Sequence, residues 1–270
     1  MSKRILITGG HSGIGLELTK QLVKEGHHIG LIMRSEKRKE GLPDAIRNYD
    51  KLDYFFADLS DQKQVRSVAE EIKTSWDQID ILYNNAGVLL DGLYDSPQGN
   101  ELHYEINTLA PYLLTSELRV LLEKSDAPTI ISTSTGGMHS RKDFDVEEFI
   151  KPTSFKKLIG SYMLSKFAMT LLMFDMAKEW PTARIISVNP GLNQTNMTKG
   201  SGMPGFLKPL AGLLFPAASK GGTILYNAAF KEDFKGQTAI YIDEKKVKAM
   251  KYSLPSAQKA RLLEGIKALS

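Results

Sequence analysis

The stretch Ile5-Leu6-Ile7-Thr8-Gly9-Gly10-His11-Ser12-Gly13-Ile14-Gly15 decides the fold. Its apolar start predicts a buried strand, its glycines predict a tight turn, and Ile14, Leu18 and Leu22 then recur at helical spacing up to Gly26. A glycine turn between strand and helix lets backbone approach a pyrophosphate, and the helix N-terminus adds unpaired N–H groups. The stretch therefore predicts a dinucleotide site with contacts from Thr8, Gly9, His11, Ser12, Gly13, Ile14 and Gly15.

The alternation of strand and helix continues along the chain. Six more strands are predicted, at His28–Met33, Leu52–Phe56, Ile79–Tyr83, Thr129–Thr133, Ala183–Val188 and Thr238–Ile242. Helices are predicted between them, at Asp61–Trp76, in a long segment ending near Lys124, through Tyr162 and Met173, and at Ser219–Phe230. Strands joined by helices run parallel. We predict an α/β fold, a doubly wound parallel sheet of about seven strands (a Rossmann fold) with helices on both faces.

Composition limits the class of protein. The 270 residues contain no linker, repeat or low-complexity segment, so we expect a single domain over residues 1–270. The absence of cysteine excludes disulfides, zinc-thiolate sites and a cysteine nucleophile. The 35 basic and 31 acidic residues are interspersed, which argues against nucleic acid as a partner. With a strand already at Ile5 and no apolar run of about 18 residues, we expect no signal peptide, no integral membrane segment and a cytoplasmic protein.

The end of the second predicted strand bears on the cofactor. Folds of this kind that prefer NAD place an acidic residue there, whereas this chain has Met33 followed by Arg34. A guanidinium can make a paired contact with a 2′-phosphate, so NADP(H) is favoured over NAD(H). Lys37 and Arg38 either add positive field or are exposed helix charges.

Two further strand ends reach the same rim of the sheet. Asp58 and Leu59 follow the third strand, and Asp58 is a candidate acceptor for the adenine amino group. Asn85, Ala86 and Gly87 follow the fourth, where small residues would let a ribose lie against backbone. Each segment taken singly is also an ordinary turn.

Tyr162-Met-Leu-Ser-Lys166 is the most informative stretch for chemistry. Spacing of four residues on a helix places the phenol and the ammonium on one face. A nearby cation stabilises a phenolate, so we expect Lys166 to lower the pKa of Tyr162 from its usual value of about 10. The pair would then exchange a proton near neutral pH.

Taken in order, these motifs together with Asn107, Ser134-Thr135 and Pro190-Gly191 resemble the short-chain dehydrogenase/reductase family, over roughly residues 3–245. Arg34 and the stretch 220–226 make the chain similar to its retinol-dehydrogenase-like members. The resemblance implies that Tyr162 is the acid/base, that Lys166 lowers its pKa and binds the nicotinamide ribose, and that Asn107 holds a water in a proton relay. It also implies that Pro190, Gly191 and Thr195 shape the nicotinamide pocket and bind the carboxamide or the pyrophosphate.

The family's third catalytic group is a serine hydroxyl that polarises the substrate oxygen. Here spacing from Asn107 places Thr135 at that position, with Ser134 one residue earlier. Adjacent side chains of a strand point to opposite faces, so one of the two hydroxyls addresses the substrate. We favour Thr135 and keep Ser134 as the alternative.

The remaining expectations concern substrate, partners and metals. Apolar residues within 197–218 predict a lid over a hydrophobic or medium-sized carbonyl or alcohol substrate, with a core helix, a subunit contact or a membrane contact as alternatives. A tail helix is predicted near 254–270, with Leu262, Leu263 and Ile266 on one side, covering the pocket or joining a neighbour. The resemblance implies a homodimer or homotetramer. No metal site is expected, because the five histidines share no ligand spacing.

Two functions follow from these expectations. The first is an oxidoreductase that moves a hydride between NADP(H) and the substrate carbon, while Tyr162 exchanges a proton with the substrate oxygen. The second is a non-catalytic NADP(H)-binding regulator or scaffold on the same fold, supported by the departure at Thr135.

Overall fold

A computed structural model describes residues 2–205 and 215–267 and contains one sheet in the order β3-β2-β1-β4-β5-β6-β7-β8. The order reverses direction at β1, which is the switch point of a doubly wound sheet. The first seven strands pair in parallel, and β8 pairs with β7 in antiparallel fashion. The strands are β1 Arg4–Thr8, β2 His28–Met33, β3 Leu52–Phe56, β4 Ile81–Asn84, β5 Thr129–Thr133, β6 Arg184–Asn189, β7 Ile240–Asp243 and β8 Lys246–Lys248.

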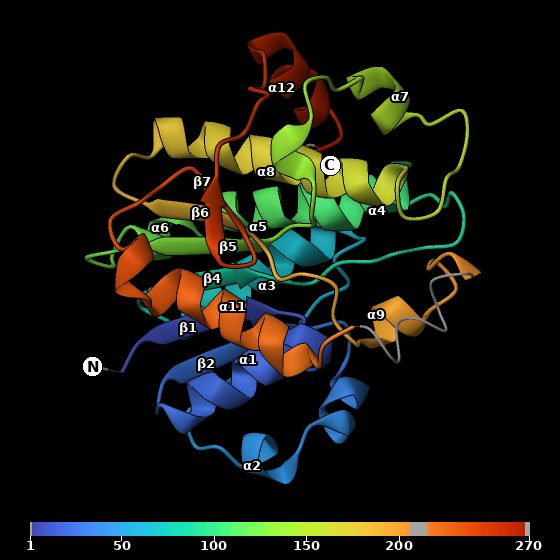
Figure 1. Cartoon of the computed structure of the whole chain (residues 1–270). Helices are drawn as coiled ribbons and strands as arrows, with labels where there is room; N and C mark the ends of the chain where they lie inside the picture. Colours follow the sequence, from blue (N-terminus) through green and yellow to red (C-terminus); the bar gives the residue numbers. More distant parts are fainter. Residues whose placement is uncertain (1, 206–214, 268–270) are drawn as a thin grey trace.

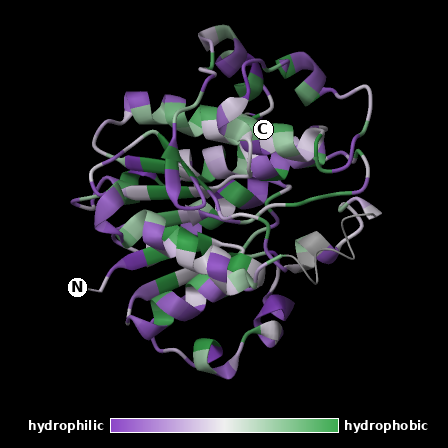
Figure 2. Cartoon of the chain, viewed as in Figure 1, coloured by the Kyte–Doolittle hydropathy of each residue, from purple (hydrophilic) through white to green (hydrophobic). Residues whose placement is uncertain are grey.

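Helices cover both faces of this sheet (Figure 1). On one face α1 (Gly13–Lys24) packs beside α11 (Ala218–Phe230); on the other lie α3 (Gln62–Ser75), α5 (Ala110–Glu117) and α8 (Ser161–Glu179). Hydrophobic and hydrophilic residues alternate along α1 and α11 in Figure 2, as expected for helices with one buried face, whereas α8 is buried all round from Ser165 to Met173. The shorter helical segments are η1 Glu36–Gly41, α2 Asp44–Arg47, α4 Leu102–Tyr104, η2 Glu105–Leu109, α6 Arg119–Leu122, η3 Met138–Ser140, α7 Val146–Ile150, α9 Asn196–Lys199, η5 Glu232–Phe234 and α12 Ser256–Leu263.

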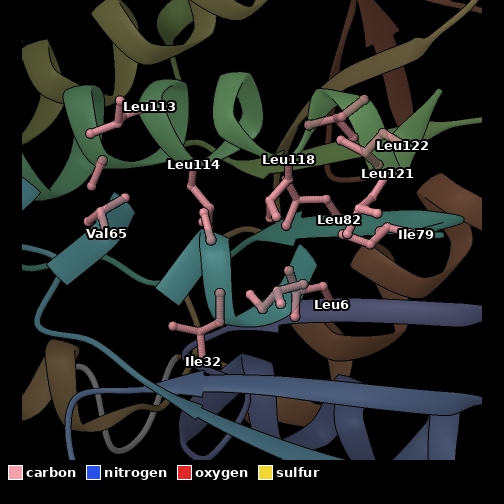
Figure 3. Close-up of a cluster of buried hydrophobic side chains, with 14 of the residues drawn as sticks. Leu6, Ile32, Val65, Ile79, Leu82, Leu113, Leu114, Leu118, Leu121 and Leu122 are labelled. Carbon is pink, nitrogen blue, oxygen red and sulfur yellow. The ribbon is translucent and has the colours of Figure 1, made fainter. Parts of the chain in front are cut away.

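Alternate residues of the strands feed two cores. Leu6 and Leu82 join one cluster with α3, α5 and α8, whereas Ile5 and Tyr83 join the other with α1 and α11. Figure 3 shows Leu6 and Leu82 in the first cluster, opposite leucines of the 110–122 segment. Because both faces are buried, the strands are almost continuously apolar, as predicted for a parallel sheet.

The long helix expected to end near Lys124 is wrong as a single element. Its residues form α4, the π-helix η2, α5 and α6, with Leu118 between the last two. Pro111 occupies the first turn of α5 and has no N–H to offer the Asn107 carbonyl four residues earlier. The wide π-turn accommodates that missing bond, and it brings Asn107 into the interior.

The eighth strand was also missed. Residues Lys246–Lys248 belong to a basic cluster that is expected on the surface, and they are too few and too polar to show strand periodicity. They pair with β7 through a turn in which Glu244 has a φ of +52°. The predicted tail helix is present as α12, between Ser256 and Leu263.

Candidate active site

A cleft of about 670 Å³ runs along the carboxyl ends of the parallel strands. Ligands of doubly wound sheets bind at this edge, near the switch point. Of the predicted site residues, all but Thr8 and Asn107 line the cleft: Gly9, His11, Ser12, Gly13, Ile14, Gly15, Arg34, Asp58, Leu59, Asn85, Ala86, Gly87, Ser134, Thr135, Tyr162, Lys166, Pro190, Gly191 and Thr195. The structure therefore brings the glycine turn, the segments after the later strands and the Tyr162–Lys166 pair together in one cleft.

Hydrogen bonds of Thr8 and Asn85 hold the glycine turn in place. The Thr8 hydroxyl accepts hydrogen bonds from the backbone N–H groups of Asn85 and Ala86, both at 3.0 Å. The Asn85 amide donates to the carbonyls of Thr8 and Gly9, at 3.1 and 3.4 Å. Gly9 and Gly13 have φ values of +68° and +53°, which side chains rarely adopt. The turn is thus held by the segment after β4, and its glycines Gly9 and Gly13 line the cleft.

Cationic groups gather at the carboxyl end of β2. Arg34 is more than half exposed, and its Nε lies 3.4 Å from Asp58 Oδ2. Asp58 Oδ1 accepts from both the backbone and the hydroxyl of Ser60, at 3.0 and 2.8 Å. The carboxylate of Asp58 therefore orients Arg34 at the rim.

Arg38 lies in the same part of the cleft, and the sequence alone did not decide whether this residue belongs to the site. Burial, and next the positive charge of Arg38, lower the pKa of His11. The Nδ1 atom of His11 is buried without a hydrogen-bond partner in the described structure. Lys37, in contrast, is exposed and is not among the residues that line the cleft.

The two candidate hydroxyls after β5 point in different directions. Ser134 is buried and its Oγ lies 3.0 Å from Thr170 Oγ1 inside the protein. The Thr135 side chain lies beside the phenol of Tyr162, where it acts to lower the pKa of that phenol. Ser134 still pairs through its N–H with Val188, so Thr135 is the first residue free of the sheet. A strand-face argument alone left these alternatives open.

Burial dominates the titration of the Tyr162–Lys166 pair. It raises the pKa of Tyr162 to about 12, and the neighbouring Thr135 side chain lowers that pKa in part. It lowers the pKa of Lys166 to about 8. The pKa of Tyr162 is therefore raised by loss of water around the phenol, where the sequence predicted that Lys166 would lower it.

Gly87 makes room for the ammonium. A Cβ at this position would lie 2.9 Å from both Lys166 Nζ and Asn107 Oδ1. Asn107 in turn is fully buried: its Oδ1 accepts from Val88 N–H at 2.8 Å, and its Nδ2 donates to Val88 O and Ser165 Oγ at 2.9 and 3.0 Å. Asn107 thus lies behind the cleft and connects the loop after β4 to the helix that carries Lys166.

The turn after β6 closes the far side of the cleft. Asn193, which sequence reasoning missed, donates to the carbonyls of Pro190 and Gly191 at 2.8 and 2.9 Å and accepts from Gly221 N–H at 3.0 Å. The Thr195 side chain lies beside the glycine turn, where its Cγ2 would be 3.2 Å from a Cβ on Gly13. This places Thr195 near the predicted pyrophosphate site.

Most of the other lining residues that sequence reasoning missed are apolar. Their side chains carry no motif or periodicity that would single them out. They are Ile32, Met33, Ala57, Val88, Leu89, Ile106, Thr133, Gly136, Leu158, Met163, Asn189, Leu192, Met197, Met203 and Glu244. Leu158 and Glu244 have φ values of +62° and +52° and are two of the three described non-glycine residues with positive φ. Such conformations cost about 1–3 kcal/mol and cluster at functional sites.

Only part of the predicted lid can be located. Met197 and Met203 line the cleft, and Phe215 follows the gap in the described residues. Phe206, Leu207, Leu210, Leu213 and Leu214 lie outside the described residues.

Within residues 2–205 and 215–267, no three His, Cys, Asp or Glu side chains are grouped so that they could hold a metal ion. Over the same part of the chain, no helix combines the length and apolar character needed to span a bilayer.

The sequence matches the family model described as short chain dehydrogenase over residues 3–144. Among curated proteins, it is 30% identical over 229 residues to dehydrogenase/reductase SDR family member 12 of Bos taurus, covering 84% of this chain and 71% of that protein. It is 26% identical over 255 residues to retinol dehydrogenase 12 of Mus musculus, covering 90% and 78%.

Solved structures share the fold. A short chain dehydrogenase of Escherichia coli CFT073 complexed with NADPH matches with a TM-score of 0.70 and 24% identity, over 90% of this chain and 97% of that one. Salutaridine reductase of Papaver somniferum matches with a TM-score of 0.69 and 21% identity, over 89% and 99%. Identities this low carry information about the fold alone.

Proposed function

Because this chain belongs to the short-chain dehydrogenase/reductase family of oxidoreductases and is similar to a retinol dehydrogenase, we propose that it transfers a hydride between NADP(H) and a carbonyl or alcohol. The single observation that carries this proposal is the convergence of Tyr162, Thr135 and Lys166 in one cleft with the glycine turn.

The cleft fits a nicotinamide dinucleotide. The glycine turn offers backbone N–H groups at the start of α1, whose first turn contains no acidic residue. The unpartnered Nδ1 of His11 is an orphaned polar atom within the same cleft. We assign the diphosphate to residues Gly9–Gly15 and Thr195, the adenosine to Asp58 and Leu59, the ribose near nicotinamide to Asn85, Ala86, Gly87, Tyr162 and Lys166, and the nicotinamide to Pro190 and Gly191.

The preference for NADP(H) rests on charge. Arg34 and Arg38 both line the end of the cleft at β2, where a 2′-phosphate would lie. A phosphate oxygen accepts charge-assisted hydrogen bonds from a guanidinium, and the ribose 2′-hydroxyl of NAD(H) lacks that charge. The Asp58 carboxylate is already engaged by Arg34 and Ser60, so it does not repel a phosphate as a free acid would.

The proton-transfer chemistry falls to Tyr162. When bound, the nicotinamide supplies or accepts the hydride. In reduction the phenol of Tyr162 donates a proton to the substrate oxygen, and its pKa of about 12 keeps it protonated at neutral pH. The Thr135 hydroxyl, which touches the same phenol, polarises that oxygen. The Lys166 ammonium would stabilise the phenolate that forms and bind ribose hydroxyls of the cofactor, while Asn107, whose side chain is bonded to Val88 and Ser165, holds the loop and the helix next to that ammonium.

The apolar residues of the cleft lining favour a hydrophobic substrate of moderate size. Leu89, Leu158, Met163, Met197 and Met203 line the cleft, and methionine adapts to varied apolar shapes. The threonine at position 135 does not favour a non-catalytic regulator on the same fold, because threonine keeps a hydroxyl beside Tyr162.

The test is NADPH oxidation against a panel of apolar aldehydes, ketones and quinones, with Tyr162→Phe as the matched variant. The wild type should turn over at least one class, and Tyr162→Phe should lose about 10²–10⁴-fold in kcat while binding NADPH as before. NADPH binding without turnover across the whole panel would instead favour the regulator.

A further inference from the structure

The C-terminal tail, residues 262–267, packs against the helical turn that carries Asn107. Gly265 leaves no space for a side chain: a Cβ there would lie 2.5 Å from the Tyr104 hydroxyl and 2.6 Å from Leu109 Cδ1. The Tyr104 hydroxyl also donates a hydrogen bond to the Leu262 carbonyl. The tail therefore touches residues on both sides of Asn107 in the chain.

A buried polar network joins the same elements. Glu105, the first residue of the π-turn η2, is fully buried, and its carboxylate accepts from Gln62 Nε2, Ser96 Oγ and Asn100 Nδ2 at 2.8, 2.8 and 2.7 Å. The amides of Gln62 and Asn100 also donate to the Gly265 carbonyl, both at 2.8 Å. Each amide thus connects Glu105 to the tail.

A second pair of contacts fixes the tail to α3. Gln62 Oε1 accepts from the Lys267 N–H at 2.8 Å, and Arg66 donates to the Lys267 carbonyl at 3.1 Å. Gln62 therefore uses both the nitrogen and the oxygen of its amide in the network. The Glu105 carboxylate is an acceptor that is surrounded by donors. A fully satisfied buried network of this kind specifies one arrangement of its members.

The opposite side of the π-turn faces the active site. Tyr104, Glu105 and Leu109 contact the tail or its network, whereas Asn107 bonds Val88 twice and Ser165 once. Ser165 precedes Lys166, and Val88 follows Gly87, which packs on the Lys166 ammonium. A shift of the turn by a few tenths of an ångström would move Asn107 against both partners.

We propose that residues 262–267 are a positioning element of the active site, and that Glu105 and Tyr104 couple this tail to Asn107. The proposal rests on the proposed function, because it assigns the tail a role in that reaction. It differs from a cover over the pocket or a contact with a neighbouring subunit, since the tail acts from behind the cleft through its own chain.

The sharpest probe is Gly265→Ala, which adds one methyl group against Tyr104 and Leu109 and changes nothing in the cleft. The control is Asp126→Ala, because this exposed side chain lies in the loop before β5, at the opposite end of the strands from the cleft. Three quantities are measured for each: kcat with NADPH, the Kd of NADPH, and hydrogen exchange of the 87–90 segment, whose Val88 amide is held by Asn107.

We expect Gly265→Ala to lower kcat about tenfold by misplacing Asn107, to speed exchange at 87–90, and to leave the Kd of NADPH within about twofold. In the Asn107→Ala background the same substitution should change kcat by less than about twofold, since the residue through which the tail acts is gone. A role confined to stability would give equal losses in both backgrounds. That result, or wild-type kcat and exchange in Gly265→Ala, would overturn the proposal.

Tyr104→Phe serves where Gly265→Ala does not fold, because it removes only the hydroxyl that bonds Leu262. It should show the same pattern at smaller size. If the wild type itself turns over no carbonyl, the proposed function fails, while faster exchange at 87–90 in either variant still supports coupling between tail and Asn107. Unchanged exchange in both variants contradicts the coupling whatever the activity.

Discussion

At the scale of single residues, we propose that position 135 decides how the substrate oxygen is held. The Thr135 side chain lies beside the Tyr162 phenol and lowers its pKa, whereas the Ser134 hydroxyl pairs with Thr170 in the interior. The main-chain carbonyl of Thr135 also accepts from the Tyr241 hydroxyl at 2.6 Å, which fixes the backbone just after β5. Sequence spacing favoured Thr135, and the direction of each side chain required the structure.

Thr135→Val and Ser134→Ala form a matched pair of variants. Thr135→Val keeps the shape of the side chain and removes its hydroxyl, so we expect kcat to fall about 10²-fold or more. Ser134→Ala should leave kcat within about threefold and cost about 1 kcal/mol of unfolding free energy, through loss of the Thr170 bond. Steady-state kinetics and denaturant unfolding measure the two effects, and the reverse order of kcat values would reject Thr135 as the polarising residue.

The titration of Lys166 predicts a pH dependence. Its pKa of about 8 means that the ammonium is present below that pH and lost above it, while Tyr162 stays protonated throughout. The rate of carbonyl reduction should therefore be constant below about pH 7 and fall as pH rises through about 8. Lys166→Met should be slower and should lack this fall. A wild-type rate that rises between pH 7 and 9 would contradict the assignment.

At the scale of elements, the carboxyl end of β2 and the η1 segment should determine cofactor choice. Arg34→Ser should weaken NADPH binding by about 10- to 100-fold, as expected for one charge-assisted contact, and leave NADH binding nearly unchanged. Lys37→Ser is the control, because Lys37 lies on the same segment and does not line the cleft. Fluorescence titration with each cofactor measures the effect. An equal effect of the two substitutions on NADPH would remove the basis for the proposed preference.

Several elements could be predicted because their signals are local. The strand β5 occupies Thr129–Thr133 as predicted, and the glycine turn after β1 is where its residues indicated. The π-turn η2 could not be predicted, because hydrophobic spacing of about four residues fits α- and π-helices almost equally well. Leu158, Asn193 and Glu244 carry no periodic signal, and only the folded chain brings them to the cleft.

At the scale of the whole molecule, the two-sided core explains why the site is confined to one edge of the sheet. Helices on both faces bury the strands, so backbone and side chains reach solvent at the strand ends. The alternation of strands and helices made this architecture predictable. The contribution of the tail was not, because contacts between Gln62 and Gly265 join residues 203 positions apart.

Transfer of the nicotinamide hydrogen is the most direct measure of the central claim. NADPH carrying deuterium at C4, on either face in separate reactions, is incubated with the wild type and an aldehyde or ketone that it reduces, and the alcohol is analysed by mass spectrometry. With one of the two labels we expect a single deuterium on the former carbonyl carbon, and Tyr162→Phe should form little labelled alcohol. Alcohol without deuterium from either label would contradict direct hydride transfer in this cleft.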